Sequence, residues 1–247
     1  MNFREITLAY YATWLGIAPV AFGCPGVRLV RSAERDKAQP GYGRPFDLYI
    51  WVAGETLIVS CGDKAAAKLP AFAEGLRGGM SAHAVAALAG RVWGVAPRHN
   101  LKFVLDTLPP LAQPALLMQG DEYENYLAFF LACHPSCRET DWLREYYDEM
   151  VARGLCFGEM AEGKLVCAND LPTMPYMADQ VQEIGINTHP NYRHQGHAKR
   201  VCLTAAHALV ARGLCPQWGT DANNAASEHL AYALGFENLA EVVTLTL

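Results

Sequence analysis

Clusters of positive charge are missing from this sequence of 247 residues. Asp, Glu, Lys and Arg together make up 18% of the chain, the formal net charge is -5, and no run of Lys or Arg is longer than two. Proteins that bind nucleic acids usually carry a broad basic surface, so this partner class is excluded. Hydrophobic residues at 51% exclude a disordered chain. The composition therefore indicates a globular protein in which any basic site is local.

Paired metal-ligand motifs are also missing. The eight cysteines are scattered over a chain long enough to bury a core without disulfides, so we expect reduced thiols and a cytoplasmic protein. The segment from Cys133 to Cys137 contains two Cys and one His, but no second Cys/His pair follows at zinc-finger spacing. We therefore expect no metal site.

A targeting or membrane-spanning segment is not expected, although residues 6–23 carry no charge. Glu5 disrupts the positive region that a signal peptide needs, and Pro19 interrupts the apolar run. Three aromatic residues stand where a uniform aliphatic segment would be expected. We interpret the stretch as a buried N-terminal helix and expect no membrane partner.

Three prolines in the segment 108–114 disfavour both helix and interior strand, so this segment is predicted to link two domains. In the N-terminal domain, residues 1–112, the pattern predicts a hairpin of 46–52 with 56–61, followed by alanine-rich helices at 65–76 and 81–88. This smaller α/β domain has no recognisable function. It is either a degenerate copy of the C-terminal domain or unrelated to it.

The C-terminal domain, residues 115–247, shows the alternating strands and helices of an α/β fold. We expect, in chain order, a strand at 115–118, helices at 122–132 and 140–153, a hairpin of 155–160 with 164–168, a strand at 182–188, a helix from 198 and a strand near 217–220. In a last helix, Asp221 or Asn223 would be the cap, and the core face would consist of Ala226, Leu230, Ala233 and Leu234.

A turn with the chemistry of a phosphate site joins the strand at 182–188 to the helix from 198. N–H groups at a helix N-terminus point outward, and the helix dipole favours anions. Gly196 would let the backbone approach a ligand, small Ala198 would let the helix pack closely, and Arg193 adds positive charge. The turn is therefore predicted to hold a phosphate group.

The residues around this turn resemble motif A of the GNAT superfamily of acyl-CoA-dependent N-acetyltransferases, whose consensus is Q/R-x-x-G-x-G/A. The matching run is Ile184-x-Ile186-x-Thr188-x-Pro190-x-Tyr192-Arg193-x-x-Gly196-x-Ala198, and the resemblance continues through Trp218, Asp221, Asn224, Ser227 and Gly235-Phe236. It covers roughly residues 115–247. The resemblance implies a mixed α/β (α+β) fold, with a central sheet in which one strand splays from its neighbour, flanked by helices.

The resemblance also implies the cofactor, acetyl-CoA, and the residues that bind it. The pantetheine arm would bond to backbone groups of Ile186, Asn187 and Thr188, and the pyrophosphate would lie on the N–H groups of the turn. Asn224 would reach the arm, and Ser227 would line the same wall. The expected cofactor-binding set is Ile186, Asn187, Thr188, Arg193, His194, Gln195, Gly196, His197, Ala198, Lys199, Asn224 and Ser227.

Glu183 is the candidate general base, because similar enzymes often carry a carboxylate just before the pantetheine-binding segment. The alternative is a strand-surface glutamate that pairs with a basic neighbour. The tyrosine that similar enzymes often use as the general acid is replaced here by Ala231. Tyr232 comes one residue later, about 100° around the helix, so we expect it to pack rather than to protonate the leaving thiolate.

Together these features predict transfer of an acetyl or acyl group from acetyl-CoA to a primary amine of a small molecule bound between the two halves. The alternative is a catalytically silent acyl-CoA-binding or regulatory module. A Rossmann oxidoreductase is excluded because no G-x-G-x-x-G turn follows a first strand. The sequence does not choose between a monomer and a homodimer.

Overall fold

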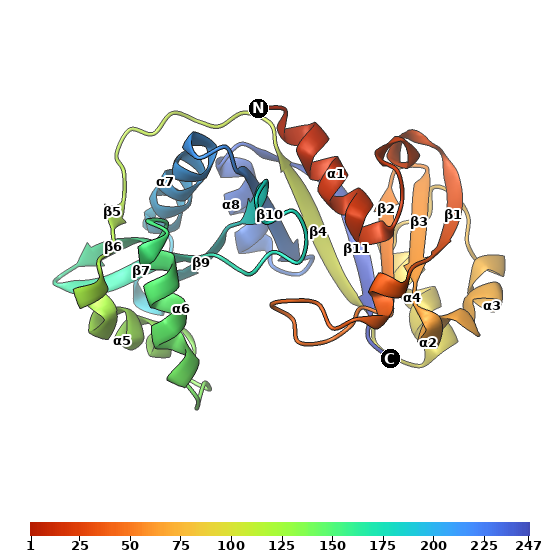
Figure 1. The fold of residues 1–247 in the computed structure, drawn as a ribbon, viewed down its shortest axis with the longest axis horizontal. Helices are drawn as coiled ribbons and strands as arrows, with labels where there is room; N and C mark the ends of the chain where they lie inside the picture. The colour runs from red at the N-terminus through yellow and green to blue at the C-terminus, as the bar shows by residue number, and fades with distance from the viewer.

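The computed structural model describes all 247 residues (Figure 1). The α-helices are α1 (Phe3–Leu15), α2 (Asp63–Ala66), α3 (Leu69–Glu74), α4 (Ala82–Trp93), α5 (Tyr123–Cys133), α6 (Asp141–Ala152), α7 (His197–Ala211) and α8 (Ala225–Ala233). Short 3-10 helices are η1 (Pro19–Gly23), η2 (Ala33–Asp36), η3 (Gly120–Glu122) and η4 (Pro190–Tyr192). The strands are β1 (Gly26–Arg31), β2 (Leu48–Ala53), β3 (Thr56–Cys61), β4 (Arg98–Leu105), β5 (Leu116–Leu117), β6 (Phe157–Ala161), β7 (Lys164–Asp170), β8 (Val181–Glu183), β9 (Gly185–Thr188), β10 (Cys215–Asp221) and β11 (Phe236–Leu245).

One mixed sheet of seven strands runs through both halves of the chain, in the order β1-β3-β2-β11-β4-β10-β8. The pairs β1 with β3 and β10 with β8 are parallel, and the other neighbours are antiparallel. A second sheet, β5-β6-β7-β9, is antiparallel. Both predicted hairpins, β2 with β3 and β6 with β7, are present. The predicted mixed α/β fold class is confirmed.

Strand β4 comes from the first half of the chain but lies between two strands of the second half. It pairs antiparallel with β10 on one side and with β11 on the other, where Arg98 is opposite Thr244 and Leu105 is opposite Phe236. No strand is predicted at this position from the sequence. As a result, the C-terminal half depends on a strand that it does not contain.

The proline-rich segment 108–114 contains no helix or strand and runs along the outside of the molecule from β4 to β5 (Figure 1). The segment therefore connects the seven-stranded sheet, which contains β4, to the four-stranded sheet, which contains β5. The division into residues 1–112 and 115–247 stays a prediction, as does the origin of the first half as a degenerate copy.

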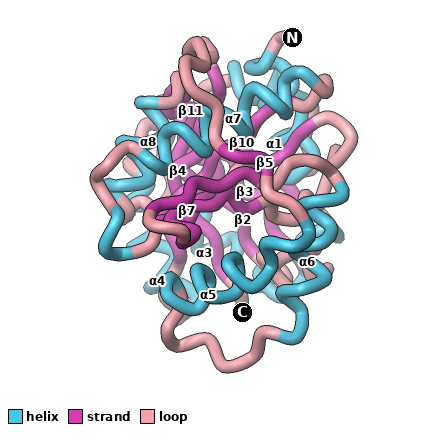
Figure 2. The backbone as a smooth tube through the Cα atoms, turned by 90° about the vertical axis from the view of Figure 1, so that its left-hand side faces the viewer, coloured by secondary structure: helices cyan, strands magenta, loops and turns pink.

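Helices cover both faces of the seven-stranded sheet (Figures 1 and 2). Neighbouring side chains of a strand point to opposite faces, and β2 shows this clearly. Tyr49 and Trp51 pack in one core with α1, whereas Leu48 and Ile50 pack in another core with α4. Helix α1 contacts β3, β4, β8 and β10, so it covers the centre of its face.

The largest core joins the two sheets and contains side chains of α5, α6 and α7. The amphipathic helix predicted from residue 198 is present as α7, and its apolar stripe faces this core as expected. Val201, Cys202, Ala205 and Leu209 are fully buried. This packing holds the N-terminus of α7 beside β7 and β9.

The uncharged stretch 6–23 forms the buried N-terminal helix that was predicted, α1, followed by η1. Tyr10, Tyr11, Trp14 and Leu15 are all buried, because α1 packs against the sheet along most of its length. No helix in the structure combines the length and the apolar character that crossing a membrane would require.

Helix α8 differs from its prediction in cap and in phase. Asn224 is the N-cap, in place of Asp221 or Asn223, and its side chain accepts a hydrogen bond from Ser227 N at 3.2 Å. The predicted core-face residues Ala226 and Ala233 are exposed, whereas Ala231 and Leu234 are fully buried and Leu230 is partly buried. The reason is that this short helix has alanines on both its exposed and its buried side, so apolar periodicity alone does not identify the buried side.

Candidate functional site

The strand predicted at 182–188 is broken at Ile184, and the two parts pair with different strands. Before the break, β8 pairs parallel with β10, and the Ile184 N–H donates to Gln217 O at 3.1 Å. After it, β9 pairs with β7 in the other sheet. A splayed gap therefore opens between β9 and the end of β10, as the resemblance implied.

The register of β9 determines which backbone groups face this gap. His189 N–H donates to Val166 O of β7 at 2.8 Å. In an antiparallel ladder such bonds alternate, so Asn187 also directs its backbone groups to β7. Ile186 and Thr188 direct theirs toward the gap, and Thr188 O accepts a bond from Arg193 Nε at 3.3 Å. Of the three residues expected to offer backbone groups there, Asn187 does not.

The turn before α7 leaves backbone N–H groups without backbone acceptors at the start of the helix. His194 and Gly196 have positive φ angles of 61° and 85°, and α7 begins at His197 with no side-chain cap. The first backbone bond of the helix runs from Arg200 N to Gly196 O at 3.2 Å, so the N–H groups of the residues from His197 to Lys199 have no backbone acceptor. A Cβ added at Gly196 would meet only Arg200 Nη1, at 3.7 Å. Conformation, rather than space, therefore favours glycine at this position.

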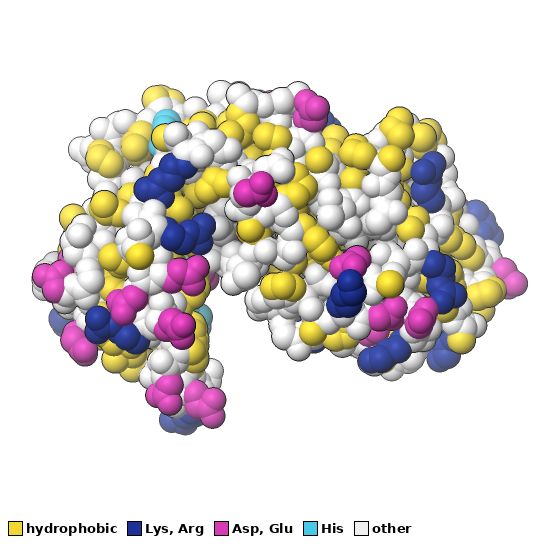
Figure 3. All heavy atoms as spheres, in the orientation of Figure 1, with side chains coloured by type: hydrophobic (Ala, Val, Ile, Leu, Met, Phe, Trp, Pro, Cys, Tyr) yellow, Lys and Arg dark blue, Asp and Glu magenta, His cyan; other side chains and the backbone are white.

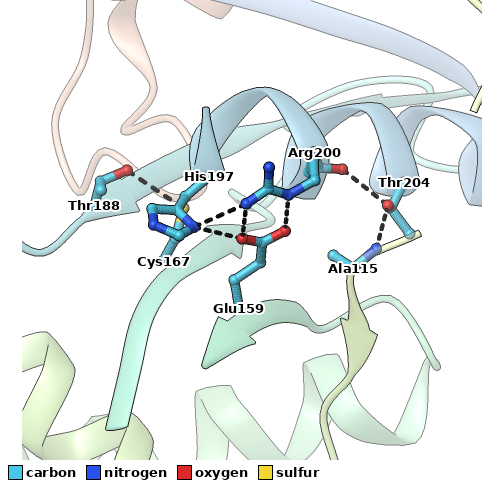
Figure 4. A network of polar contacts seen from close by, with 7 residues as sticks. All are labelled: Ala115, Glu159, Cys167, Thr188, His197, Arg200 and Thr204. Carbon is cyan, nitrogen blue, oxygen red and sulfur yellow. Dashed lines mark hydrogen bonds and ion pairs between the residues drawn. The ribbon is translucent and has the colours of Figure 1, made fainter. Parts of the chain in front are cut away.

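A largely buried carboxylate lies beneath this turn and was not anticipated. Glu159 of β6 accepts hydrogen bonds from His197 Nδ1 at 2.5 Å and from Arg200 Nη2 at 2.6 Å, and only 13% of its side chain is exposed (Figure 4). Arg200 Nε donates to the same carboxylate. This network ties the first turn of α7 to β6. Nothing in the local sequence connects residue 159 with the turn, since the contact joins segments about forty residues apart.

His189 and His194 lie on the segment between β9 and α7, whereas Ala231 and Tyr232 lie on α8. His189 caps η4 by accepting from Asn191 N at 3.3 Å, and His194 is exposed. Tyr232, expected to pack, leaves 48% of its surface exposed, although its ring contacts the ring of Phe103. Ala231, which stands where similar enzymes often have the general-acid tyrosine, is buried in the core.

Glu183 lies at the end of β8, immediately before the splayed gap, and borders a pocket on the α1 face of the sheet. A Cβ added at Gly219 of β10 would lie 3.1 Å from Glu183 Oε1 and 2.6 Å from Lys102 Nζ of β4. The two charged side chains thus approach the same backbone position from either side of β10. Because residue 219 is a glycine and has no side chain, Lys102 and Glu183 both have room at this position.

The pocket encloses about 70 Å³ and brings together residues of α1, β2, β4, β8, β11 and the loop before β2. Its lining consists of Tyr10, Tyr11, Trp14, Tyr42, Arg44, Phe46, Tyr49, Arg98, Asn100, Lys102, Glu183, Val242 and Thr244. Burial and the nearby negative charge of Glu183 raise the pKa of Tyr10 and Tyr11. These hydroxyls are therefore protonated at neutral pH.

The sequence carried a signal for one wall of this pocket that was overlooked. Arg98, Asn100 and Lys102 alternate with Leu101 and Phe103, the pattern of a strand with one polar and one apolar face. All three polar residues line the pocket, and the two apolar ones are buried in the core on the other face.

Comparison with known proteins finds a family match in the second half of the chain. Residues 137–245 match the model of the GNAT acetyltransferase family. Among solved structures, the chain resembles a GNAT-family acetyltransferase of Colwellia psychrerythraea, with a TM-score of 0.53 and 21% identity over 61% of this chain and 56% of that one. It also resembles a GCN5-related N-acetyltransferase of Sphaerobacter thermophilus, with a TM-score of 0.50 and 15% identity over 64% of this chain and 55% of that one.

The chain thus spans little more than half the length of these two solved structures, and at such identities the likeness concerns the fold. No curated protein matches the sequence. The family match covers the splayed gap, the turn before α7 and the helix α8. Residues 137–245 therefore form a domain of the GNAT acetyltransferase family.

Proposed function

We propose that this protein is an acetyl-CoA-dependent N-acetyltransferase that acts on a primary amine of a small molecule. The observation that carries the proposal is the position of Glu183. It lies where the strands begin to splay, and it faces a pocket on the α1 side. The splayed gap, proposed for the cofactor, and the pocket, proposed for the acceptor, therefore meet at the Glu183 carboxylate.

The residues around the gap fit the cofactor. The N–H groups at the start of α7 lack backbone acceptors, and the Gly196 φ of 85° exposes them to a ligand. We assign the pyrophosphate to these groups, with Arg193 and Lys199 as nearby positive charges. We assign the pantetheine arm to the outward backbone groups of Ile186 and Thr188, with the helix residues Asn224 and Ser227 on the facing wall.

Glu183 is proposed to take a proton from the acceptor ammonium. None of the ion pairs in the structure involves Glu183, so its carboxylate is available to an acceptor rather than committed to a basic neighbour. Bound acetyl-CoA supplies an acetyl group activated as a thioester. The acceptor nitrogen forms the new C–N bond as the C–S bond breaks, and the thiol leaves with one proton.

Several further features of the proposal follow the sequence prediction. The acceptor is proposed to bind between the halves of the chain, since the pocket combines residues from before and after the segment 108–114. A cytoplasmic location is proposed because all eight cysteines are free thiols, five of them buried. The chain is proposed to act without a nucleic-acid or membrane partner.

The test combines binding with turnover. Calorimetry should show that CoA and acetyl-CoA bind, and a colorimetric assay should show thiol release with a panel of primary amines. Binding without thiol release across a broad panel would support the alternative, a catalytically silent acyl-CoA-binding module. Absence of CoA binding would reject both functions.

A further inference from the structure

The pocket beside Glu183 contains more positive than negative charge. Arg44, Arg98 and Lys102 all line it, and Glu183 is its one carboxylate. None of these three cations takes part in an ion pair. Unpaired cations that converge on one concave site favour an anionic group in the molecule that fills it.

Two of the three cations lie on β4 at increasing distance from Glu183. Lys102 lies beside Glu183, across Gly219, and Arg98 lies four residues farther along β4. A strand advances roughly 3.3 Å per residue, so about 13 Å separate the two β4 positions. A small molecule whose amine reaches Glu183 would therefore direct its other end toward Arg98 and toward Arg44 from the loop before β2.

A fully buried guanidinium behind the pocket adds to the positive potential. Arg35 lies 4.9 Å from the ring centroid of Trp14 and 5.6 Å from that of Tyr49, and both rings line the pocket. Its Nε and Nη1 have no hydrogen-bond partner. The two rings are stacked at 5.0 Å, so the apolar part of the pocket lining lies next to this positive charge.

We propose that the acceptor is zwitterionic: a primary amine that also carries a carboxylate or phosphate, held by Arg98, Arg44 and Lys102. The inference rests on the proposed function for the role of the amine, and on the charge of the pocket for the anionic group. In this arrangement Glu183 selects the ammonium end, and the arginines select the anionic end. The order of Lys102 and Arg98 along β4 fixes the direction in which the acceptor binds.

Matched acceptors test the anionic group directly. Phenylalanine is compared with phenylalaninamide, and glucosamine 6-phosphate with glucosamine, so that each pair differs only in the anion. Thiol release and calorimetry, with and without CoA, should favour the anionic member of at least one pair by about 10- to 100-fold, the range expected for charge-assisted hydrogen bonds. The pair that shows the preference identifies carboxylate or phosphate.

Variants of the pocket cations then test whether these residues cause the preference for the anionic acceptor. In the triple variant Arg44→Gln, Arg98→Gln, Lys102→Gln, the preference should disappear, while the affinity for acetyl-CoA is retained. Arg98→Gln alone should raise KM for the anionic acceptor about tenfold or more without changing KM for its neutral partner. Arg28→Gln, on the exposed strand β1, is the matched control and should retain the full preference.

Each outcome decides between the two proposals. Equal or better use of the neutral members, no anionic binding below about 10 mM, or a preference that survives the triple variant would overturn the zwitterionic acceptor. Thiol release with neutral amines would then leave the proposed function intact. Conversely, charge-dependent binding of an anionic amine to a protein that binds no CoA would reject the acetyltransferase and retain the inference.

Discussion

Glu159 of β6 and Arg200 of α7 form a two-point contact beneath the first turn of α7. Arg200 Nη2 donates to Glu159 Oε2 at 2.6 Å, and Arg200 Nε donates to Glu159 Oε1. Burial by itself raises the pKa of Glu159, but the hydrogen bonds from Arg200 and His197 outweigh it and hold the pKa below its ordinary value. The contact therefore stabilises the fold whenever Glu159 is ionised, and it fixes the N-terminus of α7 against β6.

We predict that Glu159→Gln destabilises the protein at pH 7 by about 1 to 3 kcal/mol, because it removes the charge that Arg200 and His197 face. The folded-state pKa of Glu159 is depressed, so this stability is present above the unfolded pKa of about 4.3 and is lost as the pH falls through the folded pKa. Urea unfolding of both proteins between pH 7 and pH 3 should show the difference shrinking at acid pH. The exposed Glu237→Gln is the control. A difference that does not change with pH would contradict the argument.

Glu183→Gln should lower kcat by about 100- to 10,000-fold and leave the affinity for acetyl-CoA nearly unchanged, because the base acts on the acceptor amine. Steady-state kinetics across pH, with cofactor affinity from calorimetry, provides the measurement. The acid limb of the pH profile should be lost in the variant. A profile identical to that of the wild type would remove Glu183 from the role of general base.

Gly196→Val should abolish the stabilisation by CoA, since a β-branched residue disfavours a φ of 85° and would reshape the turn to which we assign the pyrophosphate. At about 100 times Kd, CoA should stabilise the wild type by ~2.7 kcal/mol, which corresponds to a melting shift of roughly 5 to 10 °C. Gly94→Val, at a φ of 74° at the end of α4, imposes a comparable strain outside the site and should keep the shift. A normal shift in Gly196→Val would show that the turn does not bind the cofactor.

The fragment 115–247 should fail to fold, although it contains the whole family match, because it lacks β4. Without β4, facing edges of β10 and β11 lose their partner, and unpaired edges promote aggregation. The fragment 97–247, which restores β4, should show more soluble protein and a cooperative melting transition by circular dichroism. Cooperative unfolding of 115–247 would contradict this dependence on the first half.

Local features of the C-terminal half were predictable from sequence. The polar and glycine-containing turn at 193–198 and the amphipathic α7 appear as expected, and the strand before the turn is present in two parts, β8 and β9. Each depends on residues within about twenty positions of one another, and glycine conformation, helix periodicity and strand alternation act over that range. The resemblance to the GNAT family began at the same stretch and continued through the residues up to Gly235-Phe236.

The buried side of α8 and the strand break at Ile184 were not predictable from the local sequence. Helix α8 has alanines on both its exposed and its buried side, so which side is buried depends on the strands against which the helix packs. The position of the break depends on the partners of β8 and β9, which lie in different sheets. In both cases the competing conformations differ little in local energy, and tertiary contacts choose between them.

The sequence by itself determined the acetyltransferase-like turn, the candidate base Glu183 and the α/β alternation of the second half. Only the tertiary structure placed β4 between β10 and β11 and thereby set Arg98 and Lys102 in the same pocket as Glu183. The reason is that β4 and β11 lie more than a hundred residues apart, and their pairing depends on complementary edges and shared cores rather than on any local pattern.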